Sequence, residues 1–552
     1  MMNKSRFHTA LLLSTAAMVL AACGGSGDVD ADTVVLHRGN SAEPLTLDPH
    51  KASGTWENNV IGDMFIGLFT DDESAAPIPG MAESWEVSED GLVWTFVLRE
   101  ASWSDGVPVT AQDFEYAFQR ILNPATLAQY SSLLYPIENA QAVNAGEMEA
   151  DAVGVTALDD RTLEIRLEYP APYLPGLLTH YTTFPVPRHV VEQYGDQWIQ
   201  PENIEVNGPY KLVQWSTNNF VHVERNELFY DNADVCVDEV FYYPTVDATA
   251  GVRRVQNGEL HLNNEFPGQH IDRLRREMPE FVRVHPYMGT VYFSLNTEFE
   301  AFEDARVRNA LGMAVNREFL AEEIYRDGRS AAYSLVPPNV ANYAGGVQAE
   351  WADWPIEQRR ERARELLMEA GYGPDNPLRF EYSHRSTGDN PRIAPVVQQD
   401  WQSIADWVNV SIVQIETQIH YENLRSADYQ AGDGGWIADY NDPYNFLFLA
   451  EERSIPMNYS RYRNSEYDNL VSRANQELDM EVRASMLADA EQMMIDDMPI
   501  IPVVFYVNRA VVSPEVTGWT DNIVHIHRTR FMCLQGEEQS AAAGTTDESS
   551  AD

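Results

Sequence analysis

Alternating apolar and polar positions predict several β-strands along the chain. Two alternating runs, 85–87 and 94–98, flank the turn Glu89-Asp90-Gly91, which is typical of a hairpin. The stretch GGWIADYNDP, from Gly434 to Pro443, has glycine and proline at its ends and predicts a loop or the edge of a strand. Further strands are predicted at 33–40, 207–215 and 500–512.

Apolar positions at helical spacing predict helices in other segments. Thr110 is followed three residues later by Asp113 and then by an apolar repeat beginning at Phe114, the pattern of a capped helix. The apolar run 61–69 also predicts a helix, after a polar loop at 47–59. Longer helices are predicted at 304–327, 356–370 and 481–498, which end before Gly328, Gly371 and Pro499.

Length and composition indicate a globular protein of more than one domain. A chain of 552 residues is too long for one ordinary core, so we expect two or three domains. Hydrophobic residues make up 44% and aromatic residues 11%, which favours aromatic-rich surfaces or clefts. Residues 536–552 have no apolar periodicity and are expected to form a disordered acidic tail.

The N-terminal residues have the pattern of an export signal. Lys4 and Arg6 precede an apolar run that is too short to span a bilayer comfortably. The sequence Leu-Ala-Ala-Cys ending at Cys23 resembles a bacterial lipobox, which implies a signal peptide at 1–22 and lipidation of Cys23. A flexible tether is then expected at 23–32. An ordinary signal peptide with an incidental cysteine is the alternative.

The formal net charge of −47 at pH 7 limits the possible partners. It argues against nucleic acid and against adsorption to an anionic membrane surface, because both would repel the chain. Solubility in a saline medium and steering of cationic ligands are two explanations for the charge. Export would allow a disulfide between Cys236 and Cys533, but the sequence does not show whether they are close.

The sequence lacks the motifs of several large enzyme classes. It has no G-x-S-x-G nucleophile elbow, no H-E-x-x-H zinc motif and no Gly-rich phosphate loop followed by Lys-Ser or Lys-Thr. Carboxylates are abundant, so a glycosidase-like pair is the enzyme alternative that stays open. We expect no catalytic residues, no cofactor and no metal.

Five ordered segments resemble the extracytoplasmic solute-binding proteins of peptide ABC importers, of the oligopeptide-binding type. The resemblance covers residues from about 33 to about 530, and the lipobox fits it independently. The segments are LTLDPHKASG at 45–54, the block from PGMAESW to VTAQDF at 79–114, NGPYKLVQW at 207–215, FEDARVRNALGMAVNRE at 302–318 and GGWIADYNDPYNFL at 434–447.

The resemblance implies a mixed α/β fold of the type II periplasmic binding protein kind. Two main lobes would be joined by a hinge, with an additional third lobe. Ligand would lie between lobes I and III, which close around it. The implied boundaries are 33–65, 190–285 and 508–535 for lobe I, 66–189 for lobe II and 286–507 for lobe III.

The resemblance also implies that Asp439 receives the α-ammonium group of a bound peptide. A desolvated carboxylate accepts charge-assisted hydrogen bonds from an ammonium group, worth roughly 1.5–3 kcal/mol. The alternative role is structural, with Asp439 capping the Asn-Asp-Pro turn that follows it.

Further site residues follow from the same resemblance. Main-chain pairing with the protein can hold extended peptides of any sequence. One pairing edge is implied at Ser53, Gly54 and Thr55, and the other at Gly435, Trp436 and Ile437, with Ala438 next to it. Gly435 suits this role because a missing side chain lets another backbone approach. The tyrosines implied to line the cleft are Tyr130, Tyr287, Tyr292 and Tyr421.

Several positions depart from the family pattern. Relatives place basic groups near the C-terminal carboxylate of the ligand, but the aligned positions here are Tyr325, Asn390 and Asp433. Arg425 is the nearest remaining cation, and Asp433 would repel a carboxylate placed close by. Ser53 stands where an acidic residue is common. We infer that the protein does not clamp the C-terminus of a short peptide and instead binds longer or basic peptides.

The sequence therefore predicts a binding protein and not an enzyme. It would be a monomer in the periplasm or cell envelope, anchored by lipid alone, that captures oligopeptides for a permease with cytoplasmic ATPase subunits. Within the family, the alternative solutes are dipeptides, murein peptides, opines or a metal chelate. A secreted hydrolase is the remote alternative.

Overall fold

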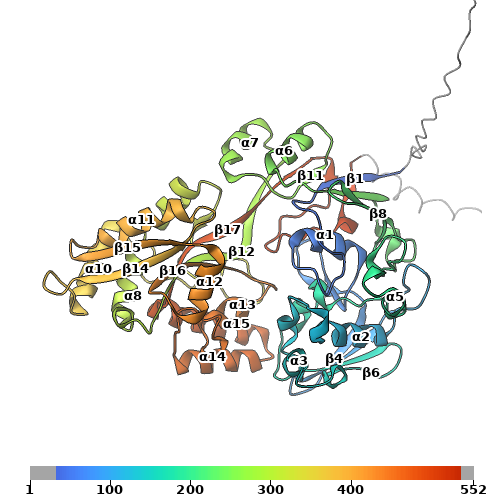
Figure 1. Ribbon diagram of the computed structural model, residues 1–552, viewed down its shortest axis with the longest axis horizontal. Helices are drawn as coiled ribbons and strands as arrows, with labels where there is room; N and C mark the ends of the chain where they lie inside the picture. Colours follow the sequence, from blue (N-terminus) through green and yellow to red (C-terminus); the bar gives the residue numbers. More distant parts are fainter. Residues whose placement is uncertain (1–32, 536–552) are drawn as a thin grey trace, which may run out of the picture. The chain divides into compact units, whose positions relative to one another are not determined.

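The computed structural model describes residues 33–535 (Figure 1). The predicted signal peptide, Cys23, the tether at 23–32 and the tail at 536–552 lie outside the described residues. Among the residues that are described, those from Val34 onward belong to one compact unit. None of the helices between residues 33 and 535 has both the length and the apolar character needed to cross a bilayer.

The largest feature is an 11-stranded sheet that mixes parallel and antiparallel pairs. Its strands follow the order β15–β14–β16–β12–β17–β11–β1–β10–β9–β8, and β13 pairs with β17 beside this path. The bounds are β1 Val35–Gly39, β8 Tyr210–Ser216, β9 Phe220–Arg225, β10 Glu239–Tyr243, β11 Leu262–Asn263, β12 Val282–Leu295, β13 Ser330–Ala331, β14 Leu378–Arg385, β15 Val408–Ile415, β16 Ala431–Ile437 and β17 Ile500–Val512.

The long antiparallel strands β12 and β17 connect the two ends of this sheet. Figure 1 shows them side by side, with β14 to β16 on one flank and β11 and β1 on the other. Their pairing register shifts between Pro286 and Thr290. The lobe boundaries predicted at 285/286 and 507/508 fall inside these two strands. The division into three lobes stays a prediction.

Three smaller sheets complete the β-structure of the described chain. The predicted hairpin is confirmed, because Trp85 pairs with Phe96 and Val87 with Trp94. A disulfide joins Cys236 to Cys533, with Cα atoms 5.3 Å apart. The four-stranded sheet has the order β4 Ala82–Val87, β5 Val93–Leu98, β7 Thr162–Arg166 and β6 Val155–Ala157, and the pairs are β2 Phe69–Asp71 with β3 Pro77–Pro79 and β18 Val516–Thr517 with β19 Cys533–Leu534.

Fifteen α-helices occur between residues 33 and 535. In Figure 1, α8, α10 and α11 lie around strands β14 and β15. The bounds are α1 Thr55–Met64, α2 Ala111–Leu122, α3 Ala140–Asn144, α4 Leu174–Leu177, α5 Arg188–Tyr194, α6 Ala248–Gln256, α7 Ile271–Glu277, α8 Ala305–Ala314, α9 Arg317–Phe319, α10 Ile356–Glu369, α11 Asn390–Gln402, α12 Thr417–Ser426, α13 Tyr444–Leu447, α14 Ser465–Gln476 and α15 Met480–Asp497.

Two helix predictions need correction. The helix predicted at 61–69 instead runs from Thr55, inside the expected polar loop, to Met64, and Phe69 begins β2. Glu57 of its first turn is buried, and its carboxylate accepts the Leu45 N–H at 2.9 Å. The helix predicted at 304–327 breaks after Ala314, where Val315 is extended. Arg317 is fully buried there and donates to the carbonyl of Pro502 at 2.8 Å, a contact that local sequence cannot reveal.

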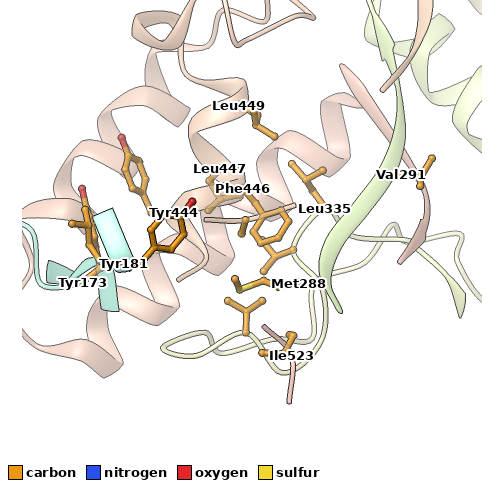
Figure 2. Close-up of a cluster of buried hydrophobic side chains, with 14 of the residues drawn as sticks. Tyr173, Tyr181, Met288, Val291, Leu335, Tyr444, Phe446, Leu447, Leu449 and Ile523 are labelled. Atoms are coloured by element: carbon orange, nitrogen blue, oxygen red, sulfur yellow. The ribbon is translucent and has the colours of Figure 1, made fainter. Parts of the chain in front are cut away.

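The hydrophobic core reaches the part of β12 that faces the candidate site. Figure 2 shows Met288 and Ile523 next to each other, near Phe446 of α13. The Met288 N–H also donates to the Ile523 carbonyl at 2.9 Å. This packing holds the segment around Ile523 against β12.

Candidate functional site

A cavity of about 310 Å³ is enclosed by segments that are far apart in the sequence. Its walls come from the start of α1, from β2 and β3, from residues 130 and 176–181, from β12, from the loop after β16 and from residues 524–526. Eight residues named in the sequence analysis line it: Ser53, Gly54, Thr55, Tyr130, Tyr287, Ile437, Ala438 and Asp439.

Asp439 lies in the loop that follows β16, and its backbone is held in place. The Asn445 side-chain oxygen accepts the Asp439 N–H at 3.4 Å and the Trp436 indole N–H at 2.9 Å. Trp436 thus supports the loop from behind, with its ring edge-on against Phe448 at 5.3 Å.

The carboxylate of Asp439 has no hydrogen bond or ion pair with any residue between 33 and 535. Burial alone raises the pKa of Asp439 from 3.8 to about 6. An unpaired carboxylate at a cavity wall, still ionised at neutral pH, is suited to receive a cation.

The structural role considered for Asp439 is taken by another residue. Asp442 accepts the Tyr444 N–H at 3.0 Å in the turn after the loop. It also forms a buried double ion pair with Arg483 of α15, with distances of 2.7 and 2.8 Å. Asp439 is therefore not needed to cap this turn.

Aromatic rings surround the Asp439 carboxylate. Burial and the nearby charge of Asp439 raise the pKa of Tyr130, and burial with smaller contributions from Tyr130 and Asp439 raises the pKa of Tyr287 to about 12. His180 and Tyr181, which the sequence analysis did not identify, stand beside Tyr130 with ring centres 5.3 and 6.5 Å away. Burial lowers the pKa of His180 to about 3. These groups are therefore neutral at pH 7 and do not compete for the carboxylate.

Strand β16 offers an unpaired edge that leads to Asp439. β12 pairs with β16 along 431–437, whereas β14 pairs with it only at Ala431 and Gly432. The Ala438 N–H donates to Met288 of β12 at 2.9 Å, and pairs alternate in an antiparallel ladder. The N–H and C=O groups of Gly435 and Ile437 therefore point away from β12. The outward carbonyl of Asp433 is already bonded to Nε2 of His420 at 2.8 Å. We call residues 435–437, on the side away from β12, the free edge.

The first predicted pairing edge is not a strand. Gly54 is extended, and Thr55 is already the first residue of α1. A side chain at Gly54 would collide with the Glu57 carboxylate and the Trp56 ring, so a larger residue here would have to displace both of them. Ser53 to Thr55 still line the cavity, with the N-terminal turn of α1 behind them.

Seven predicted site residues do not line the cavity. Tyr292 is buried within β12, and Asn390 begins α11, where its side chain donates to the Thr387 carbonyl at 3.0 Å. Gly435 and Trp436 belong to the free edge and its support. The full set is Gly435, Trp436, Tyr292, Tyr421, Arg425, Asn390 and Asp433.

The expectation for Asp433 needs correction, because a cation that the sequence analysis missed neutralises it. The Arg385 guanidinium lies 2.6 Å from the Asp433 carboxylate and donates to the Tyr421 hydroxyl at 2.8 Å. Arg425 instead stands on the exposed face of α12, 3.8 Å from Glu422. Arg385 is the last residue of β14, so only the pairing of β14 beside β16 brings it to Asp433.

Comparison with known proteins places the chain in a family. The family model "Bacterial extracellular solute-binding proteins, family 5 Middle" matches residues 76–453. The chain belongs to this family. Its members bind solutes for transporters and are not enzymes.

Relatives resemble the chain over nearly its whole length. The periplasmic oligopeptide-binding protein OppA of Salmonella typhimurium is 38% identical over 521 residues, 93% of this chain and 94% of the relative. Among solved structures, the unliganded open form of the murein tripeptide-binding protein MppA has a TM-score of 0.84 at 32% identity, covering 91% of this chain and 98% of MppA. OppA of Haemophilus influenzae in complex with RPPGFSPFR has a TM-score of 0.72 at 31% identity, covering 91% and 99%.

Proposed function

We propose that this protein captures oligopeptides in the cavity that contains Asp439 and delivers them to an ABC importer. The observation that carries the proposal is the unpaired Asp439 carboxylate. A peptide α-ammonium group supplies three donors and a full positive charge, which compensates for the cost of partly removing this carboxylate from water.

The free edge supports a ligand with a peptide backbone. The outward N–H and C=O groups of Gly435 and Ile437 can exchange hydrogen bonds with an added strand whose N-terminus reaches Asp439. Such pairing does not read side chains, so it suits a protein that accepts many sequences. The murein tripeptide and RPPGFSPFR named for the two solved relatives are both peptides.

We propose that the ligands are longer or basic peptides. At about 3.3 Å per residue, the four steps from Gly435 to Asp439 span roughly 13 Å, enough for a peptide of about four residues. At the far end Arg385 is already neutralised by Asp433, so the free edge offers no free cation there to clamp a carboxylate. The net charge of −47 favours the approach of basic peptides.

We also propose that closure of a hinge buries the ligand between lobes I and III. The register shift in β12 between Pro286 and Thr290 adjoins Tyr287 of the cavity wall, at the predicted lobe boundary. Binding would shift the protein toward a closed form that a permease recognises. The location proposed is outside the cytoplasmic membrane, with a lipid anchor at Cys23 and a monomeric protein.

Native mass spectrometry of the purified protein and its co-purified ligands tests the proposal. We expect a heterogeneous set of peptides with free N-termini, several residues long and rich in Lys or Arg. A uniform set of acidic di- or tripeptides would rule out the length and charge preference. Turnover of an added peptide or sugar library would instead favour a hydrolase.

A further inference from the structure

Three histidines from two distant segments meet beside the cavity. His285 belongs to β12, and His525 and His527 follow β18 in the C-terminal part of the described chain. One ring nitrogen of each lies within 4.8 Å of the other two. His285 and His525 are 240 positions apart, and His525 and His527 are two apart, which matches no metal-binding motif. Only the fold reveals the cluster.

The surroundings of His525 leave a nitrogen lone pair directed into the cluster. The Asn264 carbonyl lies 3.0 Å from Nε2 of His525, and a carbonyl can only accept, so this nitrogen carries the hydrogen. Nδ1 of His525 is then the basic nitrogen, and it lies 3.2 Å from Nε2 of His527. A histidine that donates its second N–H to a backbone carbonyl is the usual arrangement of a metal ligand.

His285 provides the independent observation. The residue is 7% exposed, yet neither of its ring nitrogens forms a hydrogen bond of good geometry among residues 33–535, although the Asn522 backbone lies nearby. The Asp521 carboxylate stands 3.6 Å from Nδ1, which leaves Nε2 free. A buried, unpaired imidazole nitrogen is costly unless a ligand uses it.

Aromatic packing alone does not account for the cluster. Trp519 stacks on His527 with ring centres 3.5 Å apart, and the Asn522 side-chain N–H donates to Nδ1 of His527 at 3.4 Å. Nε2 of His527 can then donate to His525, which satisfies those two rings without an ion, and binding of an ion would move the hydrogen of His527 to Nδ1. None of these contacts gives His285 a partner. A shared ion would satisfy all three imidazoles together.

We propose that His285, His525 and His527 bind one divalent transition-metal ion of the class that prefers imidazole ligands, such as Zn²⁺, Ni²⁺ or Cu²⁺. Three nitrogen ligands leave at least one coordination position for water or a solute. Because His525 also lines the cavity, the ion would fasten the cavity wall at 524–526 to β12. This site does not depend on the proposed peptide function.

Calorimetric titration of the chelator-treated protein, without a histidine tag, with Zn²⁺ tests the site. We expect one equivalent of Zn²⁺ to bind per protein molecule. Co²⁺ bound at the same site should give the visible absorption bands of an ion that nitrogen ligands hold with low symmetry. His285→Gln and His527→Gln should each weaken zinc binding by more than the roughly 10–100-fold that loss of a supporting partner costs. His261→Gln is the matched control, because His261 stacks on His37 at 5.6 Å without a third histidine.

His285→Gln and His527→Gln replace buried residues and could disturb folding. Asp521→Asn keeps the test decisive in that case, because the Asp521 side chain is 39% exposed and its replacement should leave the fold intact. We expect it to weaken zinc binding about 10–100-fold, and His527→Gln to retain peptide affinity. The proposal is overturned if the unaltered protein binds no single equivalent. Zinc binding by Asp521→Asn and His285→Gln at unaltered affinity would overturn it equally.

Discussion

At the scale of single residues, the binding role proposed for Asp439 comes at a cost to the stability of the unliganded protein. Its carboxylate is half-buried at a cavity wall, and no described residue compensates its charge. The unliganded protein therefore bears a cost that a cationic ligand removes. Such costs are common where a binding site is formed before its ligand arrives.

Asp439→Asn should stabilise the unliganded protein at high pH. The folded-state pKa of about 6 exceeds the ordinary 3.8, so the folded protein holds this proton more tightly than the unfolded chain. The carboxyl group costs little below about pH 4, and stability is lost as the pH rises through 6. Urea unfolding at pH 8 should show a gain of about 1–3 kcal/mol in the variant, and almost none at pH 4. A loss at pH 8 would contradict this assignment.

At the scale of elements, strand β16 and the loop after it carry the residues proposed to bind the ligand. β12 supports one side of β16, and the free edge on the other side is where a ligand backbone can pair. The loop then places Asp439 at the end of that edge. The free edge and the loop that holds Asp439 can each be altered by a separate substitution.

Ile437→Pro removes one outward N–H from the free edge. The ladder with β12 does not use this N–H, so the fold should be retained. We expect peptide affinity to fall about 3–10-fold, the equivalent of one hydrogen bond. Ile437→Val keeps the N–H and should change affinity less than about twofold. Isothermal titration of both variants with one peptide measures the difference, and equal affinities would show that Ile437 does not pair with the ligand.

Asp442→Asn should have the opposite effect on stability to Asp439→Asn, although the two residues are three positions apart. The substitution leaves the buried Arg483 guanidinium of α15 without its counter-charge. We expect a loss of about 3–5 kcal/mol in the free energy of unfolding at pH 7 and a weaker hold on the Asp439 loop. Urea denaturation compares the two variants directly. Similar effects from both would mean that the two carboxylates have the same environment.

Elements that depend on neighbouring residues could be predicted from the sequence. The capping box of α2 and the hairpin of β4 and β5 are examples, because their partners lie within a few positions. The break after Ala314 and the ion pair of Arg385 with Asp433 could not be predicted, because distant segments supply the partners. In the site, Asp439 and part of the cavity wall were implied by the family resemblance, whereas His180, Tyr181 and Arg385 were not identified.

At the scale of the whole molecule, the disulfide constrains the described chain more than any local contact. It links Cys236 to Cys533 across 297 residues. Closing so long a loop restricts the unfolded chain strongly. The bridge is therefore expected to affect stability and not recognition.

Reduction of this disulfide should lower the free energy of unfolding by about 2–5 kcal/mol. Peptide affinity should not change, because neither cysteine lines the cavity. Denaturation and titration with and without reductant measure both effects. A Cys236→Ser and Cys533→Ser double variant should match the reduced protein and not respond to reductant. Loss of peptide affinity on reduction would contradict the expected separation.

The central claim is that the Asp439 carboxylate receives the α-ammonium group of a peptide. Isothermal titration of the unaltered protein and of Asp439→Asn, each with one peptide and its N-acetylated form, tests it most directly. We expect the substitution to weaken binding of the free-amine peptide about 10–100-fold and to change binding of the acetylated peptide much less. An equal loss for both peptides would contradict the claim and give Asp439 a structural role.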